Sequence, residues 1–186
     1  MKTQTKELTI CAMFSALIII GAFLKIDIPL PLYTMHFTLQ WLFVILATLL
    51  LGERLGTLSV VVYILLGLAG LPVFAAGGGI GYVLRPGFGF LLGFVLAAFL
   101  IGLIMKKVKS QSLMSMIIAA AVGELAYYSV GAVYFYLIKN LYVGDAVSFR
   151  VVVVSYCLIT VIPDFILCVL ASLLAQKLKP ILNRIY

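Results

Sequence analysis

Four ionisable residues stand within or beside long apolar stretches of the sequence, namely Arg85, Glu124, Arg150 and Asp164. A charge inside an apolar span costs at least about 2.5–3.5 kcal/mol, so each needs a partner, a wet cavity or a function. Asp164 follows Pro163, which removes a backbone donor and loosens the helix around the carboxylate. We therefore expect Asp164 to contact a ligand rather than to form a structural ion pair. Glu124 either contacts the ligand or pairs with Arg85 or Arg150 between helices.

A glycine-rich segment, residues 70–90, separates two of the apolar stretches and contains seven glycines and two prolines. Such a backbone is tolerated at membrane depth only where protein or a water-filled cavity satisfies its amides. We expect this segment to cover a ligand, with Gly79 in its backbone and Tyr82 and Arg85 as polar contacts. An ordinary outer turn is the alternative. Gly79-x-Gly81 precedes no Lys-Ser/Thr pair, so a phosphate-binding loop is not indicated.

The stretch 28–41 carries further candidate ligand contacts. Two prolines keep its chain extended before the next helix begins. Gln40 then offers an amide, and Trp41 offers a ring that can pack on a flat ligand. Tryptophan is also common in the interfacial belt of membrane proteins, which is the alternative for Trp41. His36 has no acid or nucleophile near it in the sequence, and we interpret it as structural.

Ala12 and Ala16 place two small side chains one turn apart on one face of the first apolar stretch. Small residues at this spacing let another helix approach closely, because packing drives helix association in lipid. The spacing fits a partner protein and intramolecular packing equally well.

Composition defines the elements that must position these residues. Of the 186 residues, 65% are hydrophobic and 10% are charged, which is far outside the range of soluble domains. We predict an all-α integral membrane protein, a single domain over residues 1–186 with six transmembrane helices. Its apolar runs are Leu8–Leu24, Phe37–Leu51, Leu55–Phe74, Phe88–Met105, Leu113–Ile138 and Val147–Leu174. The last run is long, and we expect a kink or a broken segment at Pro163.

The distribution of lysine and arginine predicts the orientation, since cationic loops are retained in the cytoplasm. Nine cations fall at the termini and in the even-numbered loops, and four in or near the odd-numbered loops. The first set is Lys2, Lys6, Arg54, Lys106, Lys107, Lys109, Lys177, Lys179 and Arg184; the second is Lys25, Arg85, Lys139 and Arg150. We therefore predict that both termini are cytoplasmic. The net charge of +7 reflects these flanks and indicates no nucleic-acid partner.

Motifs of enzymes and metal sites are missing from the sequence. It has no His-Glu-x-x-His, no Gly-x-Ser-x-Gly and no Walker sequence. Its three cysteines lie inside apolar runs without Cys-x-x-Cys spacing, and we interpret them as small packing residues. We predict no catalytic residue, no metal and no cofactor, and the chain has the character of a binding subunit.

Taken together, the segments resemble the BioY family, the biotin-specific S components of energy-coupling-factor (ECF) vitamin transporters. The resemblance covers nearly the whole chain, and its specificity lies in the order and spacing of the pieces. They are Phe37-Thr-Leu-Gln40-Trp41, Leu51-Gly-Glu-Arg-Leu-Gly56, the stretch from Tyr63 to Phe74, Gly77-Gly-Gly-Ile-Gly81 leading to Pro86-Gly-Phe-Gly-Phe90, and Pro163-Asp164. Ala12-x-x-x-Ala16 also matches the Ala-x-x-x-Ala element of the family.

This resemblance implies a high-affinity biotin-binding subunit in the cell membrane that is not an enzyme. It further implies that Ala12 and Ala16 dock on a transmembrane coupling subunit, and that two ATPase subunits, not this chain, bind ATP. For such a ligand, Asp164 would accept from the ureido N–H groups, and Gln40 or Tyr82 would serve the remaining polar atoms. The Trp41 ring and the glycine loop around Gly79 would pack on the rings of biotin.

The sequence departs from the family pattern at two places. The family often has Gly-Pro-Thr-Gly-Gly-Tyr where this chain has Arg85-Pro-Gly-Phe-Gly-Phe90, and a lysine three residues after the aspartate where this chain has Leu167. If that lysine meets the carboxylate of the ligand, Arg85 is its candidate replacement here. Two rival functions remain open: an S component for another vitamin, and a self-contained channel or carrier.

Overall fold

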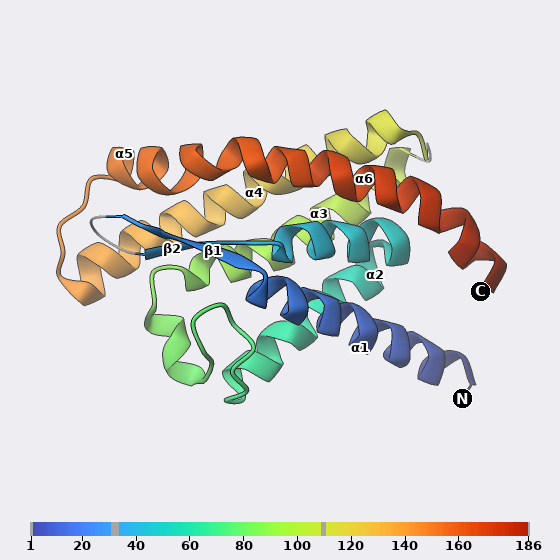
Figure 1. The fold of residues 1–186 in the computed structure, drawn as a ribbon, viewed down its shortest axis with the longest axis horizontal. Helices are drawn as coiled ribbons and strands as arrows, with labels where there is room; N and C mark the ends of the chain where they lie inside the picture. Colours follow the sequence, from blue (N-terminus) through green and yellow to red (C-terminus); the bar gives the residue numbers. More distant parts are fainter. Residues whose placement is uncertain (1, 31–33, 109–110, 186) are drawn as a thin grey trace.

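The computed structural model describes residues 2–30, 34–108 and 111–185, and helices make up most of it (Figure 1). Lys109, counted above among the cytoplasmic cations, lies outside the described residues. In chain order the elements are α1 (Lys2–Phe23), β1 (Lys25–Pro29), β2 (Thr34–Thr38), α2 (Gln40–Leu68), the 3₁₀ turn η1 (Ile80–Leu84), α3 (Phe88–Val108), α4 (Leu113–Ile138), the π turn η2 (Lys139–Val143), α5 (Phe149–Val152), the π turn η3 (Val153–Leu158) and α6 (Ile159–Ile185). Within these residues, five helical stretches are long and apolar enough to cross a membrane.

Helix α2 folds back on itself, which explains why two predicted runs appear as one element. Gly52 has φ 82° and ψ −177°, a conformation that is essentially restricted to glycine. Gln40 and Tyr63 would lie about 34 Å apart in a straight helix, yet Gln40 Nε2 donates a hydrogen bond to Tyr63 Oη over 2.6 Å. Residues 40–51 and 53–68 are therefore two antiparallel arms joined at Gly52.

Close packing of α3 on α4 is made possible by glycine. A Cβ at Gly93 would lie 2.6 Å from the backbone oxygen of Tyr127, so no larger residue fits there without a shift of the backbone. Because glycine has no side chain, the backbones of α3 and α4 can approach each other closely at this position. This contact brings Tyr127 of α4 next to Phe94 of α3, with ring centroids 5.1 Å apart.

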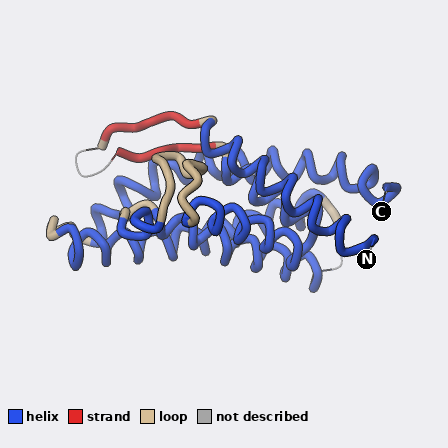
Figure 2. The backbone as a smooth tube through the Cα atoms, turned by 90° about the horizontal axis from the view of Figure 1, so that it is seen from below, coloured by secondary structure: helices blue, strands red, loops and turns tan. Residues whose placement is uncertain are grey.

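A two-stranded antiparallel hairpin departs from the all-α prediction. The sequence indicated an extended chain before α2, and the structure pairs β1 with β2 so that Asp27 lies opposite His36. The hairpin lies along the outside of the helices, beside the loop that follows α2 (Figure 2). The all-α prediction is therefore confirmed only in part: the described chain is mostly helical, and this hairpin is the exception.

The last helical stretch runs from Phe149 to Ile181 without a break at Pro163. Its irregularity lies earlier than predicted, in the π turn η3, whose last residue is Leu158. A π turn widens the helix locally and often occurs at functional sites. The predicted irregularity is thus displaced toward the N-terminal side of Pro163.

Both described ends of the chain lie at one end of the molecule, together with the bend of α2 and the α3–α4 connection (Figure 1). The hairpin, η1 and the α4–α5 connection lie at the other end. Large apolar side chains such as Leu125 and Ile162 are 66% and 70% exposed on the outside of the helices. Such a surface is stable in contact with lipid rather than with water.

Candidate ligand-binding site

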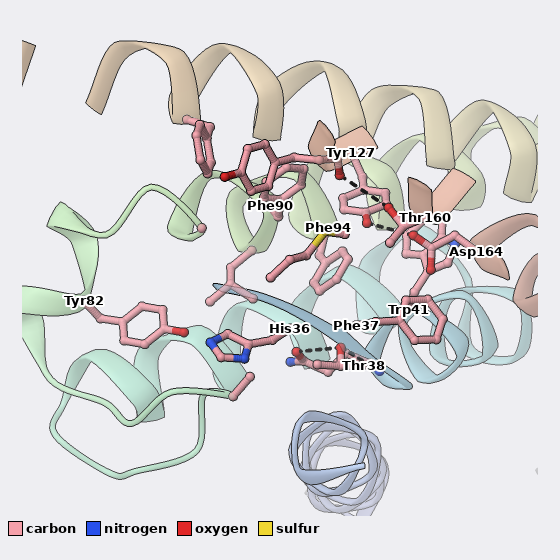
Figure 3. Close-up of a pocket in the computed structure, with 17 residues that line it drawn as sticks. His36, Phe37, Thr38, Trp41, Tyr82, Phe90, Phe94, Tyr127, Thr160 and Asp164 are labelled. Carbon is pink, nitrogen blue, oxygen red and sulfur yellow. Dashed lines mark hydrogen bonds between the residues drawn. The ribbon is translucent and has the colours of Figure 1, made fainter. Parts of the chain in front are cut away.

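A cavity opens between the helices at the end that carries the β1–β2 hairpin (Figure 3). Its walls come from β2, the start of α2, the segment between α2 and α3 that includes η1, and from α3, α4 and the last helical stretch. The lining residues are Met35, His36, Phe37, Thr38, Gln40, Trp41, Ala75, Tyr82, Gly87, Phe90, Leu91, Phe94, Tyr127, Phe135, Tyr156, Thr160 and Asp164. Aromatic side chains predominate, and few polar groups are placed among them, as is usual for small-molecule sites.

Asp164 supplies the buried carboxylate of the cavity, with 3% of its surface exposed. The hydroxyl groups of Tyr127 and Tyr128 donate to its Oδ2 over 2.9 Å and 2.5 Å. Thr160 Oγ1 lies 2.8 Å from the Tyr128 hydroxyl and extends this network one turn along the same helix. Charge-assisted bonds of this kind lower the cost of burying a carboxylate.

A wall of aromatic rings continues from Asp164 into the cavity. Trp41 stacks on Phe94 with ring centroids 5.7 Å apart and an interplanar angle of 15°. Tyr127 lies 5.0 Å from Trp41 and 5.7 Å from Phe90. Flat, apolar parts of a ligand can pack against such a wall, because offset stacking is favourable for aromatic systems.

Gln40 lies at the start of α2 and lines the cavity, as does Trp41 next to it. The Gln40 amide nitrogen donates to the hydroxyl of Tyr63 on the second arm of α2, and the Gln40 Oε1 lies 3.2 Å from Thr38 Oγ1. These contacts fix the orientation of the amide before any ligand arrives. The fold of α2 at Gly52 thus positions a predicted site residue.

His36 lines the cavity from β2. Its Nδ1 lies 2.6 Å from Asp27 Oδ1, and Lys25 Nζ lies 3.2 Å from Asp27 Oδ2. The hydrogen bond with His36 is the main reason why the pKa of the Asp27 carboxyl is below its ordinary value, and Lys25 adds to the effect. The interpretation of His36 as an isolated structural residue missed this partner, because pairing of β1 with β2 was not predicted.

Arg85 and Gly79 lie in the predicted loop but outside the set of cavity-lining residues. The Arg85 guanidinium donates to the Ala76 carbonyl over 3.0 Å and stands 5.0 Å from the centre of the Tyr82 ring. Gly79 has φ 95°, and its N–H donates to the Gly67 carbonyl over 2.7 Å. Of the three predicted contacts in this segment, the structure therefore brings only Tyr82 to the cavity wall.

Glu124 is buried between helices and is not among the cavity-lining residues. Its Oε2 accepts a hydrogen bond from Cys168 Sγ over 3.3 Å. In the part of the chain that the structure describes, Glu124 forms no ion pair with Arg85 or Arg150. The alternative of pairing between helices is therefore not realised.

Several cavity-lining residues were not singled out from the sequence, among them Tyr127, Thr160 and Phe94. A signal existed for the first of them, because two consecutive tyrosines beside Glu124 in an apolar run are unusual polar groups at membrane depth. Thr160 precedes Asp164 by four residues and so shares its helix face. For Phe94, the sequence shows nothing that separates it from an ordinary packing residue.

Comparison with known proteins identifies the family. The model of the BioY family matches residues 1–184. The chain belongs to the BioY family. A probable biotin transporter BioY from Lysinibacillus sphaericus is 43% identical over 175 residues, which cover 94% of this chain and 87% of that relative. The biotin transporter BioY from Thermotoga maritima is 38% identical over 179 residues, covering 94% and 96%.

A solved structure agrees with this assignment. The crystal structure of the S-component for biotin from an ECF-type ABC transporter matches with a TM-score of 0.85 and 29% sequence identity, covering 96% of this chain and 93% of that chain. With transporters as relatives and five long apolar helical stretches in its described part, the chain is a multi-pass integral protein of the cell membrane and not an enzyme.

Proposed function

We propose that this chain is the biotin-binding S component of an ECF-type transporter. The observation that carries the proposal is the position of Asp164, a buried carboxylate at the end of an aromatic cavity. Biotin offers two ureido N–H donors, which match the acceptor oxygens of a carboxylate, and an apolar ring and chain, which match the aromatic wall. The names of the relatives support the same ligand, since they are biotin transporters.

The proposed membrane topology has six spans with both termini in the cytoplasm. Within the described residues, five helical stretches are long and apolar enough to span a membrane, and α2 contributes two antiparallel arms because it folds back at Gly52. An even number of spans puts both termini on one side, and the excess of cationic residues at that end favours the cytoplasm.

The proposed partners are a transmembrane coupling subunit and two ATPase subunits, which would use ATP on behalf of this chain. Ala12 and Ala16 are both exposed on α1, whereas Cys11 and Ser15 of the same helix are buried against the molecule. An exposed pair of small residues is available for a helix of another protein. This exposure favours an external partner over the intramolecular alternative.

Titration of the purified chain with biotin tests the proposal most directly, by heat or by the fluorescence of Trp41, which is the only tryptophan and lines the cavity. We expect saturable binding of one biotin per chain and no binding of thiamine or riboflavin. Binding of thiamine or riboflavin in place of biotin would indicate that the chain is an S component for that vitamin. Uptake by liposomes that contain this chain alone would instead support the self-contained carrier.

Substitution of Asp164 locates the site within the chain. We expect Asp164→Asn to weaken biotin binding roughly ten- to a hundredfold, because a charge-assisted hydrogen bond contributes about 1.5–3 kcal/mol. Asp145→Asn is a matched control, since Asp145 lies in the α4–α5 connection and pairs with Lys139. Unchanged affinity in the Asp164 variant would remove this carboxylate from the site.

A further inference from the structure

A second buried polar contact between α4 and α6 lies one helical turn away from Asp164. Glu124 is 4% exposed, and its Oε2 accepts a hydrogen bond from Cys168 Sγ over 3.3 Å. Cys168 follows Asp164 by four residues, and Glu124 precedes Tyr128 by four, so this contact repeats the contact of Tyr128 with Asp164 one turn further along both helices. Neither Glu124 nor Cys168 lines the cavity. The pair therefore lies behind the cavity wall.

The burial of Glu124 has no evident basis in stability. Within the described residues Glu124 forms no ion pair, and the thiol that donates to it is a weak donor. Replacement of both partners of a buried hydrogen bond by apolar groups of the same shape can be nearly neutral or stabilising. A directional role, in which the carboxyl group orients the thiol of Cys168, accounts for a polar pair at this position.

The Cys168 thiol also faces the indole of Trp41. The Trp41 side chain is 1% exposed, and its N–H forms no regular hydrogen bond within the described residues. This N–H interacts with the Cys168 sulfur, which is a weak acceptor. The thiol thus stands between the Glu124 carboxyl group, to which it donates, and the indole N–H. Because its proton is directed at Glu124, the lone pairs of the sulfur remain for the indole.

The position of the Trp41 ring matters because this ring forms part of the cavity wall (Figure 3). Phe94 stacks on it at an interplanar angle of 15°, and Tyr127 lies 5.0 Å from its centre. Stacking contacts restrict the tilt of a ring, but they allow it to slide or turn within its own plane. A polar contact at the N–H edge removes that freedom. The aromatic neighbours therefore hold the faces of the indole, and the thiol holds its edge.

We propose that Cys168 and Glu124 are positioning residues of the ligand site: Glu124 orients the Cys168 thiol, and the thiol fixes the edge of the Trp41 ring in the cavity wall. This inference rests on the proposed function, because biotin is the ligand against whose rings Trp41 would pack. It replaces the interpretation of Cys168 as a small packing residue. For Glu124 it replaces the direct ligand contact expected from the sequence with an indirect role in binding.

The test compares Cys168→Ala with Cys168→Ser in the full-length protein. Alanine and serine differ little in size, but only serine can donate to Glu124 and accept from the indole. We expect Cys168→Ala to weaken biotin binding by about three- to tenfold, since a hydrogen bond contributes about 1 kcal/mol, and Cys168→Ser to restore most of the affinity. Cys157→Ala is the matched control, because Cys157 is also a buried cysteine of the last helical stretch and lies outside the cavity lining.

Circular dichroism in the near ultraviolet reports on the indole itself, without any ligand. Trp41 is the only tryptophan, and tryptophan absorbs at longer wavelengths than tyrosine, so the long-wavelength edge of the spectrum belongs to this ring. Such a band depends on fixed packing of the side chain. We expect Cys168→Ala to reduce the Trp41 band, whereas Cys168→Ser and Cys157→Ala should retain it.

Glu124→Leu and Glu124→Gln give an independent comparison if Cys168→Ala does not fold, which a loss of the helical far-ultraviolet signal would reveal. Glutamine keeps an acceptor oxygen for the thiol, and leucine does not. We expect the leucine variant to show the loss of affinity and of the Trp41 band that is predicted for Cys168→Ala. The glutamine variant should show neither loss.

Equal biotin affinities in Cys168→Ala and Cys168→Ser would overturn the inference, because the thiol would then act by packing alone. A weakened affinity with an unchanged Trp41 band would overturn it as well, since the effect would not pass through the indole. Wild-type protein that binds no biotin would instead refute the proposed function. The spectra of the unliganded variants would still show in that case whether the thiol positions Trp41.

Discussion

At the scale of single residues, the site depends on how the carboxylate of Asp164 is held. The phenols of Tyr127 and Tyr128 both donate to Oδ2, which leaves Oδ1 as the oxygen that can accept from a ligand. Because Asp164 is buried, water does not compete for this hydrogen bond, and the low local dielectric strengthens it. We therefore expect the two tyrosines to affect ligand binding through the orientation of Asp164.

Tyr128→Phe removes one of these donors without changing the size of the ring. We expect biotin affinity to fall by about three- to tenfold, since a hydrogen bond contributes about 1 kcal/mol. Tyr134→Phe is the matched control, because Tyr134 lies on the same helix and donates to the Val83 carbonyl, outside the cavity lining. Calorimetric titration of both variants checks the prediction, and equal affinities in the two would contradict it.

At the scale of elements, the bend of α2 positions the polar start of that helix. The arms 40–51 and 53–68 lie side by side only because the chain reverses at Gly52. On the same side of the molecule, Lys106 pairs with Glu53, and Lys179 donates to the Leu49 carbonyl over 3.1 Å. These contacts tie the bend to α3 and α6.

Gly52→Ala should destabilise the protein by about 1–3 kcal/mol, because its φ of 82° is unfavourable for any residue with a Cβ. Gly81→Ala is the control, since Gly81 does not share the positive φ and an added Cβ meets no atom within 4 Å at either position. Thermal unfolding in detergent should show a lower Tm for the first variant only. The same Tm for Gly52→Ala and wild type would mean that the bend does not require glycine.

The exposed face of α1 gives a prediction about assembly. Ala16→Trp should abolish biotin uptake by the complete transporter, because a large ring prevents close approach of a partner helix. Binding of biotin to the isolated subunit should not change, since Ala16 is exposed and lies outside the cavity lining. Leu125→Trp, at an exposed position of α4, is the control and should leave uptake intact. Normal uptake with Ala16→Trp would argue against docking at this face.

At the scale of the whole molecule, the two ends of the helical bundle differ in chemistry. One end carries the termini, the bend of α2 and most of the lysines, and the other carries the hairpin, whose strand β2 lines the cavity. This arrangement suits capture of a ligand outside the cell and attachment to partners inside it.

Cysteine labelling can test this orientation against a low background, because the three native cysteines are buried. Leu141→Cys, at a position that is 80% exposed near the α4–α5 connection, should react with a membrane-impermeant maleimide in intact cells. Lys107→Cys, exposed at the end of α3, should react only after permeabilisation. The reverse pattern would invert the proposed topology.

The sequence alone determined the membrane class, most of the helices and part of the site. Apolar runs predict spans because the bilayer fixes their length, and α4 has the predicted bounds, Leu113–Ile138. Asp164, Gln40, Trp41 and Tyr82 stood out because a polar or amphipathic group at membrane depth requires a reason, and all four line the cavity.

Only the tertiary structure decided what brings distant residues together. The pairing of His36 with Asp27 depends on strand register, and the contact of Tyr128 with Asp164 depends on the packing of α4 against the last helix. Neither follows from local sequence, because residue type and spacing fix which face of an element a side chain occupies but not which element packs against that face. Which polar groups meet at the cavity is therefore a property of the folded chain.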